Sequence, residues 1–250
     1  LNFPSDKYIC ELIAKDFNID FNFLDYGSDL MADIENLKEF IKEKRGIIVL
    51  SHVAFKSSYR YPIKEISKFC KDNNTIVIWD LSHSIGAIDI NMELNQVDYA
   101  IGCTYKYLNG GPGSPAFIYV REQELRKLKS PIRGWISHEK PFEYSNEYNE
   151  SNSIEKFSNG TPHILSLSTL KTSLDITIEA TTEELNIKST KLFDYFESIY
   201  TNELKKLNFE LLTPMDKSKR GSHIAIRPEE AWINSKCLIN PIDNDELSII

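Results

Sequence analysis

Two short apolar runs joined by one amphipathic segment constrain the fold more than any other feature of the sequence. The runs are residues 46–51 and 75–80, which are rich in isoleucine and valine and close on Ser51 and Asp80. Between them, residues 62–72 carry apolar side chains at helical spacing and predict a helix that begins near its proline. This order predicts a βαβ crossover with parallel strands. Such strands present ligands at their carboxyl ends, where both polar residues lie.

A lysine follows a third apolar run. Residues 98–102 predict a strand, and residues 103–114, Cys-Thr-Tyr-Lys-Tyr-Leu-Asn-Gly-Gly-Pro-Gly-Ser, predict a loop that is shaped by glycine and carries Lys106. Most loop lysines are solvated surface charges, so the inference rests on the acid Asp80 and on His83 at the neighbouring strand end. A pyridoxal phosphate enzyme needs a lysine for the Schiff base, a carboxylate for the pyridine nitrogen and hydroxyls for the phosphate.

Three segments resemble the kynureninase family of fold type I pyridoxal phosphate hydrolases. They are residues 79–86 (Trp-Asp-Leu-Ser-His-Ser-Ile-Gly), residues 98–117 with the lysine loop, and residues 133–135 (Arg-Gly-Trp). The resemblance covers about residues 1–226 in register. It implies hydrolysis of L-kynurenine, or of its 3-hydroxy form, to anthranilate or 3-hydroxyanthranilate and L-alanine, in tryptophan catabolism and NAD biosynthesis.

The resemblance also implies site residues. It makes Lys106 the cofactor-linked base, Asp80 the partner of the pyridine nitrogen, and Tyr105 the phosphate donor. It implies further cofactor contacts from Phe3, Pro4, Ser5, Asp6, Ser51, His83, Trp135 and Thr161. Trp135 and Thr161 match positions that reach the phosphate of the neighbouring subunit, so the resemblance implies a homodimer with shared active sites.

Several of these residues also have a simpler interpretation. Ser5 or Asp6 can cap a helix that follows the turn at residues 3–6. Thr161, which precedes a proline, can cap the next long helix, and Ser51 can be an ordinary strand-end cap. A lone histidine at position 83 is a structural hydrogen-bonding group about as often as a ligand.

The remaining pattern predicts an α/β protein with two domains. Residues 1–180 are expected to form the cofactor-binding large domain, a mostly parallel sheet flanked by helices, and residues 181–250 part of a small C-terminal α+β domain. We expect further helices at 33–44, 121–129, 165–180 and 183–207, the last with Leu185, Leu192, Phe193 and Phe196 facing inward. Further strands are expected at 115–120, 209–212 and 222–226. Residues 139–159 are expected to form a polar surface excursion, and residues 243–246 a solvated tail.

Composition narrows the range of partners. A net charge of −8 without a basic stripe argues against nucleic acid and against anionic membrane surfaces. The apolar runs are far shorter than the roughly 20 residues of a membrane helix, and no signal peptide pattern is present, so we expect a cytoplasmic protein. Four scattered cysteines without a Cys-x-x-Cys pair indicate reduced thiols, and neither a zinc site nor a disulfide framework.

Two alternatives stay open. One is another fold type I enzyme, such as a class V aminotransferase or a cysteine desulfurase, although no cysteine lies in a glycine- or serine-rich loop of the desulfurase kind. The other is a truncated, non-catalytic subunit, because the chain begins at Leu1 and no arginine follows Arg227. The family's first phosphate-binding turn and its carboxylate-binding arginine are therefore unmatched. We expect these 250 residues alone to bind pyridoxal phosphate poorly and to turn over little.

Overall fold

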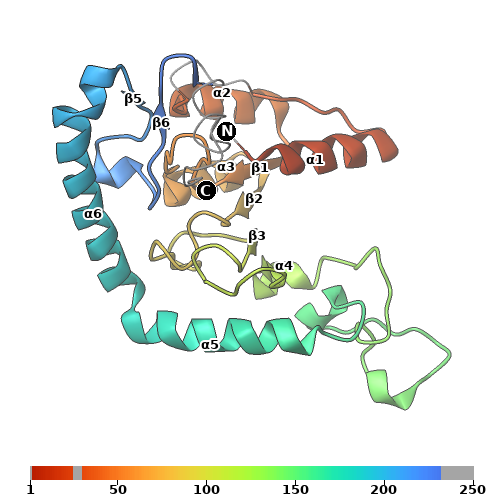
Figure 1. Cartoon of the computed structure of the whole chain (residues 1–250). Coiled ribbons are helices and arrows are strands. Elements are labelled where there is room, and N and C mark those ends of the chain that lie inside the picture. The colour runs from red at the N-terminus through yellow and green to blue at the C-terminus, as the bar shows by residue number, and fades with distance from the viewer. Residues whose placement is uncertain (1, 25–29, 232–250) are drawn as a thin grey trace.

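The computed structural model describes residues 2–24 and 30–231 and has a four-stranded sheet at its centre (Figure 1). The strands are β1 (Ile47–Ser51), β2 (Ile76–Asp80), β3 (Tyr99–Cys103) and β4 (Ala116–Val120), in the order β1-β2-β3-β4. The first three strands are parallel and β4 is antiparallel to β3. The α/β class and the predicted strands are confirmed.

Helix α3 (Ile63–Asp72) connects β1 to β2, as the apolar pattern predicted. The Trp79 side chain is fully buried beneath this helix, and its indole Nε1 donates to Ser67 Oγ at 3.0 Å. The register pairs Ser51 with Asp80, so the two polar strand ends lie side by side. The core around them is formed by Leu37, Ile41, Leu50, Ala54, Tyr59, Tyr61, Ile63, Ile66, Cys70, Val77, Trp79, Leu81, Val97 and Ala100.

The core at Ile66 gives a test of this packing. Its side chain is 0% exposed on the inner face of α3. Ile66→Val removes one methylene from a closely packed site and is expected to lower the free energy of unfolding by about 1 kcal/mol. Urea unfolding should detect the change, and Ile187→Val, at a side chain that is 48% exposed, is the matched control. Equal stability of the two variants would contradict the packing of α3 on the sheet.

The two N-terminal helices differ in how they begin. The Asp33 carboxylate caps α2 (Ile34–Lys44) by accepting from the backbone N–H groups of residues 35 and 36, both at 3.0 Å. Helix α1 (Pro4–Asp16) begins at its proline, and Phe3 occupies the cap position without a side-chain hydrogen bond. The predicted cap by Ser5 or Asp6 is therefore wrong, because the fixed φ of proline suits the first helical position and places both residues inside the first turn.

The segment after β4 is less helical than predicted. Helix α4 covers only Glu122–Leu125, because the chain then continues as a turn in which Lys127 N donates to the Glu124 carbonyl and Leu128 N to the Leu125 carbonyl. The polar excursion contains two short 3-10 helices, Pro141–Glu143 and Ile154–Phe157. Within it, Lys156 is 4% exposed and its Nζ donates to the Leu128 carbonyl at 3.0 Å, which ties the excursion to the domain.

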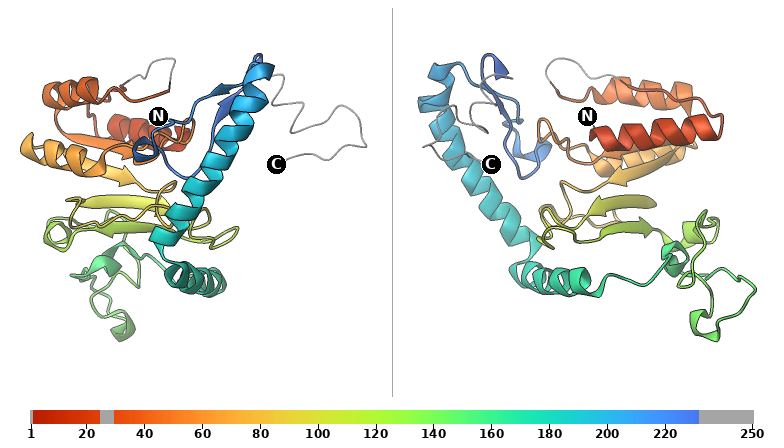
Figure 2. Two further views of the ribbon diagram at one scale, coloured as in Figure 1. Left: turned by 90° about the vertical axis from the view of Figure 1, so that its left-hand side faces the viewer. Right: turned by 45° about the vertical axis from the view of Figure 1, so that its right-hand side comes forward.

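Two long helices follow. Helix α5 (Ile164–Ala180) is capped by His163, whose Nδ1 accepts from Ser166 N at 3.2 Å, so the predicted cap by Thr161 is wrong. Figures 1 and 2 show α6 (Thr182–Asn202) leaving the end of α5 at a steep angle and running past the sheet. On α6, Phe193 is buried beneath Arg220, whereas Leu192 is 58% exposed, which corrects its predicted inward position.

A short two-stranded sheet lies near the far end of α6. Its strands, β5 (Glu210–Leu211) and β6 (Ile226–Arg227), are antiparallel and shorter than predicted. A 3-10 helix (Leu204–Leu207) joins α6 to β5, and another (Lys217–Lys219) lies between the strands. The division of the chain near residue 180 remains a prediction, and the tail predicted at 243–246 lies outside the described residues.

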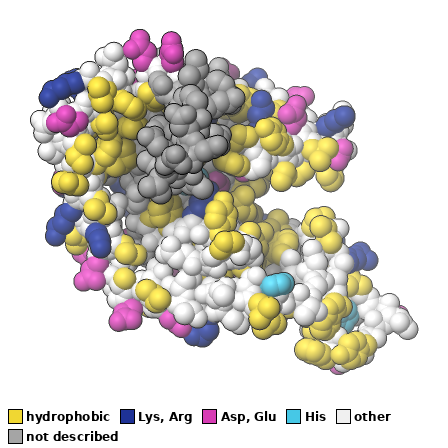
Figure 3. Space-filling model, viewed as in Figure 1, with side chains coloured by type: hydrophobic (Ala, Val, Ile, Leu, Met, Phe, Trp, Pro, Cys, Tyr) yellow, Lys and Arg dark blue, Asp and Glu magenta, His cyan; other side chains and the backbone are white. Residues whose placement is uncertain are grey.

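Large apolar side chains remain exposed on several helices. Figure 3 shows them gathered over α1 at the upper right and over α6 at the left. On α1 they include Tyr8, Ile9, Leu12 and Ile13, which are 49–66% exposed, so the predicted helix exists but its apolar face is not covered. None of the helices among the described residues is both long and apolar enough to span a bilayer.

Candidate functional site

The polar ends of β1 and β2 form the floor of the site. The side chain of Asp80 is 5% exposed and that of Ser51 is 3% exposed. Ser51 Oγ donates to Asp80 Oδ2 at 3.3 Å, and the backbone N–H of Ser82 donates to Asp80 Oδ1 at 2.9 Å. Two donors from different segments therefore hold the buried carboxylate in one orientation. The predicted juxtaposition of Ser51 and Asp80 is confirmed.

The lysine loop begins where β3 ends and is closed by Thr104. The Thr104 carbonyl accepts from Gly110 N at 2.9 Å, and its hydroxyl donates to the Pro115 carbonyl at 2.5 Å. Gly111 has φ of +81°, which suits glycine and few other residues. Helix α5 supports the loop from outside, where Thr169 Oγ1 donates to the Gly110 carbonyl at 3.3 Å. The predicted loop shaped by glycine is confirmed.

Aromatic rings lie beside the Lys106 amine. Its Nζ is 5.5 Å from the ring centre of Tyr105 and 5.9 Å from that of Phe3. The Phe3 ring packs edge-on against Phe55, with 5.2 Å between the ring centres. The start of α1 is thus brought to the carboxyl end of the sheet, as the resemblance implied for Phe3. Tyr105 is 52% exposed, and its role as a phosphate donor remains a prediction.

Asp6 lies in the first turn of α1 and faces the same group. Burial, and next the nearby Asp80 carboxylate, raise the pKa of Asp6 from its usual 3.8 to about 6, while Lys106 opposes the shift. Asp6 Oδ2 is buried and has no hydrogen-bond partner among the described residues. Asp6 also borders a cavity of about 1220 Å³ between α1, α2 and β1. An unpaired buried acceptor beside an amine, a carboxylate and an aromatic ring fits a polar ring ligand that brings its own donor.

Asp6→Asn gives a prediction with a defined pH dependence. Because the pKa of Asp6 is higher in the folded chain, ionisation of Asp6 lowers the free energy of unfolding. This loss of stability builds up as the pH rises from near 4 through about 6. Asparagine removes this loss. The variant should be more stable than the parent at pH 7.5 by about 1 kcal/mol, after allowance for partial solvent exposure, and equally stable below pH 4.

Urea unfolding between pH 3.5 and 8 measures this difference. Glu11→Gln, at an exposed carboxyl on the same helix, is the control and should show no gain that grows with pH. A gain for Asp6→Asn that is independent of pH, or no gain at pH 7.5, would contradict the placement of Asp6 near Asp80.

Three histidines surround the site or its floor, and only His83 was predicted. Burial, followed by Lys106 and His223, lowers the pKa of His83 to about 4, while Asp80 opposes this, so the ring is neutral at pH 7. His223 packs against it with 5.4 Å between the ring centres. His52 is 2% exposed beside Trp79, and burial lowers its pKa to about 3. The spacing of apolar residues does not predict the contact of His223 with His83, because the two residues are far apart in the sequence.

The other predicted contacts lie at the margin. Pro4 and Ser5 are exposed in the first turn of α1. Trp135 is 43% exposed and packs edge-on against Phe142, and Thr161 is exposed ahead of α5. Within the described part of the chain, neither Trp135 nor Thr161 is brought to Lys106. Both were matched to the site of a neighbouring subunit, so their role remains a prediction.

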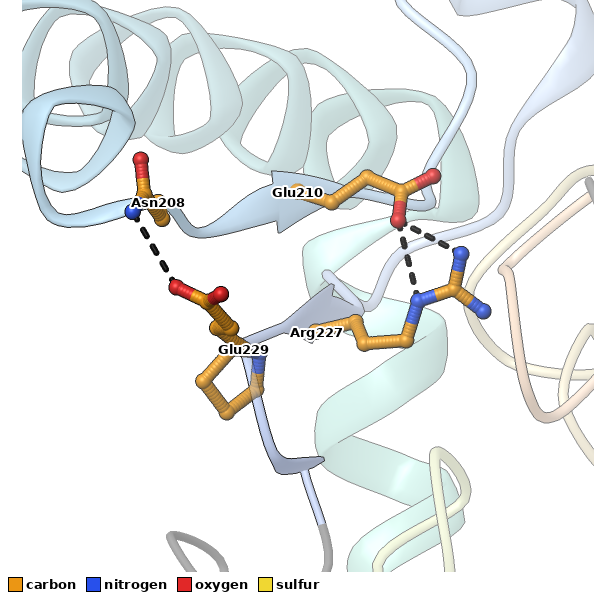
Figure 4. A pocket seen from close by; sticks show the side chains of 5 residues that line it. Asn208, Glu210, Arg227 and Glu229 are labelled. Atoms are coloured by element: carbon orange, nitrogen blue, oxygen red, sulfur yellow. Dashed lines mark hydrogen bonds and ion pairs between the residues drawn. The ribbon is translucent and has the colours of Figure 1, made fainter.

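A separate small cavity lies at the β5–β6 sheet. Figure 4 shows its lining, with the Arg227 guanidinium directed at the Glu210 carboxylate. Arg227 Nη2 and Nε lie 2.5 and 2.9 Å from Glu210 Oε2, so the two charges are already paired. In this cavity of about 330 Å³ the Glu229 carboxylate accepts from Asn208 Nδ2 at 3.2 Å, no lysine is present among the described residues of the lining, and we place the functional site at the sheet instead.

Comparison with known proteins finds similar sequences over nearly the whole chain. The family model described as Aminotransferase class-V matches residues 2–230. The kynureninase of Pseudomonas fluorescens is 34% identical over 239 residues, which cover 96% of this chain and 56% of that protein. The kynureninase of Deinococcus radiodurans is 31% identical and covers 92% of this chain and 54% of that protein. The chain thus spans about half the length of these relatives.

Solved structures give the same fold at lower identity. The apo cysteine desulfurase of Thermococcus onnurineus NA1 aligns with a TM-score of 0.74 at 20% identity, covering 89% of this chain and 54% of that chain. A C-DES mutant with glycine covalently linked to its PLP cofactor aligns with a TM-score of 0.76 at 17% identity, covering 91% and 59%. At these identities the likeness establishes the fold.

Proposed function

Because the chain belongs to the aminotransferase class-V family, we propose that it carries the active site of a kynureninase, which hydrolyses L-kynurenine to anthranilate and L-alanine. The cofactor is pyridoxal phosphate. The observation that supports the proposal most is the convergence of Asp80, Lys106 and Phe3 at one edge of the sheet, with the unpaired Asp6 acceptor beside them. The relatives named kynureninase narrow the substrate class.

Each residue has a definite task in this reaction. When bound, pyridoxal phosphate supplies an electron-withdrawing ring that stabilises negative charge at the substrate α-carbon. The Asp80 carboxylate would hold the proton on the ring nitrogen, and the hydroxyl of Ser51 and the N–H of Ser82 keep that carboxylate in place. Lys106 would hold the cofactor through its amine, and the same amine, when free, would take the proton from the substrate α-carbon. Water would add at the γ-carbonyl, and the Cβ–Cγ bond would then break so that Cγ leaves as the carboxylate of anthranilate while Cβ keeps the electron pair and takes up a proton to give L-alanine.

The cysteines favour a hydrolase over a cysteine desulfurase. Burial raises the pKa of Cys70 to about 11. Burial, and next the charge of Asp6, also raise the pKa of Cys10. Cys103 Sγ lies against the Ser82 carbonyl at 3.9 Å. None of these three described thiols lies in an exposed loop, and Cys237 lies outside the described residues.

The proposal extends to the oligomeric state of the protein and to the pathway in which it acts. We propose a homodimer in which Trp135 and Thr161 serve the neighbouring subunit, and exposed apolar faces on α1, α5 and α6 offer surface for such contacts. The proposed setting is tryptophan catabolism and NAD biosynthesis in the cytoplasm.

Product analysis tests the proposal. The chain, supplied with excess pyridoxal phosphate, is incubated separately with L-kynurenine and with its 3-hydroxy form. We expect an aromatic amine product and L-alanine in equal amounts, at a low rate. Transfer of the amino group to an added keto acid, without release of anthranilate, would instead support an aminotransferase. Cofactor attachment with neither product would support the non-catalytic subunit.

A further inference from the structure

His223 connects two segments that flank the lysine. Its Nε2 lies 3.1 Å from the Phe55 carbonyl oxygen, and its Nδ1 lies 3.5 Å from the hydroxyl of Tyr107. Phe55 belongs to the loop after β1, and Tyr107 follows Lys106 directly in the chain. One imidazole therefore contacts both segments, and it packs on the His83 ring as well.

The two hydrogen bonds define the tautomer of His223. A backbone carbonyl only accepts, so Nε2 carries the hydrogen and donates to Phe55. In the neutral ring Nδ1 is then an acceptor, and the Tyr107 hydroxyl donates to it across a long hydrogen bond. Burial lowers the pKa of His223 while the bond to Phe55 opposes the shift, which favours the neutral form that this arrangement needs.

The backbone before His223 is fixed against the same loop. Gly221 N donates to the Ser58 carbonyl at 2.8 Å, and Arg220 forms an antiparallel bridge with Tyr59. A Cβ on Gly221 would lie 2.6 Å from Val53 Cγ1, so the chain approaches as closely as glycine allows. The position of His223 is thus set by several contacts and does not depend on its side chain alone.

Both partners of His223, Phe55 and Tyr107, belong to segments that lie beside Lys106. The Phe55 ring packs on Phe3, whose ring lies beside the Lys106 amine. On the other side, the Tyr107 backbone lies against Gly86, where an added Cβ would be 2.8 Å from the Tyr107 carbonyl oxygen. Movement of His223 would therefore reach the lysine from the aromatic side and from its own loop.

We propose that His223 is a positioning residue for Lys106 and Phe3. As the neutral Nε2–H tautomer, it joins the loop after β1 to the lysine loop and so fixes the amine and the aromatic ring relative to each other. The role of these residues toward the cofactor rests on the proposed function. The connection that His223 makes between the two loops does not.

Two substitutions separate the hydrogen bonds from the volume of the ring. His223→Gln keeps one N–H donor and one carbonyl acceptor, whereas His223→Leu fills similar space and has neither. We expect His223→Leu to weaken pyridoxal phosphate binding on the order of tenfold, the loss of roughly one to two hydrogen bonds, and His223→Gln to stay within about threefold of the parent. A cofactor titration followed by absorbance measures this. His163→Leu, which alters an exposed helix cap, is the control.

A second measurement needs no cofactor. Nitrogen NMR of the chain should show His223 in its Nε2–H form, and the side-chain signals of Lys106 should shift in His223→Leu and stay near their parent values in His223→Gln. Unshifted Lys106 signals in His223→Leu, or equal effects of both substitutions, would overturn the proposal. If the parent chain takes up no cofactor, the proposed function fails and the NMR result still decides the role of His223.

Discussion

Lys106→Ala is expected to abolish covalent attachment of pyridoxal phosphate and to lower anthranilate release by about 10⁴-fold or more. The expectation follows from the position of the amine at the carboxyl end of the sheet, beside the Phe3 and Tyr105 rings. Under the proposed function, alanine removes both the group that would bind the cofactor and the base that would move the α-proton. Absorbance of the bound cofactor and fluorescence of released anthranilate measure the two losses separately.

Lys56 is the matched control for this experiment. Its Nζ lies 5.8 Å from the ring centre of Phe55, which packs on Phe3. Lys56→Ala should keep covalent attachment, whereas Lys106→Arg, which keeps the charge but lacks a nucleophilic amine, should lose it. If covalent attachment survived in Lys106→Ala and disappeared in Lys56→Ala, the cofactor-binding lysine would be Lys56, and the assignment to Lys106 would be wrong.

Asp80→Asn is expected to reduce anthranilate release by about 10²- to 10³-fold at saturating cofactor, because a charge aimed at the reacting system is lost. Asparagine is nearly isosteric and can still accept from Ser82 N and bond to Ser51 Oγ. The fold should therefore be preserved, and the effect should appear in the rate more than in the unfolding midpoint. Steady-state kinetics together with urea unfolding make this comparison.

An exposed carboxylate provides the reference for Asp80. The Asp72 side chain is 58% exposed on α3, where it pairs with Lys68. Asp72→Asn should leave the rate unchanged. If Asp80→Asn were as active as Asp72→Asn, the buried carboxylate would have no role in the chemistry, and the assignment of the strand end as the active site would fail.

The sheet and the lysine loop were predictable because their signals are local. A run such as residues 75–80 has few alternatives to a buried strand, and the glycines after Lys106 exclude a regular continuation. Parallel pairing then brings Ser51 beside Asp80 without further information. The expectation of Phe3 beside Lys106 came from the family resemblance, since nothing in the local pattern places the start of α1 there.

The errors and omissions arise where tertiary contacts decide. His163 caps α5 in place of Thr161 because the helix starts beyond Pro162, and either residue type can accept from a free N–H group. His223 was not assigned, because its position depends on the bridge between Tyr59 and Arg220, which are far apart in the sequence. The exposed side of Leu192 shows that helical periodicity alone does not fix which face a long helix buries.

The most direct test of the central claim is to reduce the cofactor-treated chain with borohydride and to map the labelled peptide. We expect one pyridoxyl label, on Lys106 just after the end of β3, with Lys56 unlabelled in the same digest. A label on Lys56 or on any other lysine, with Lys106 unmodified, would contradict the central claim.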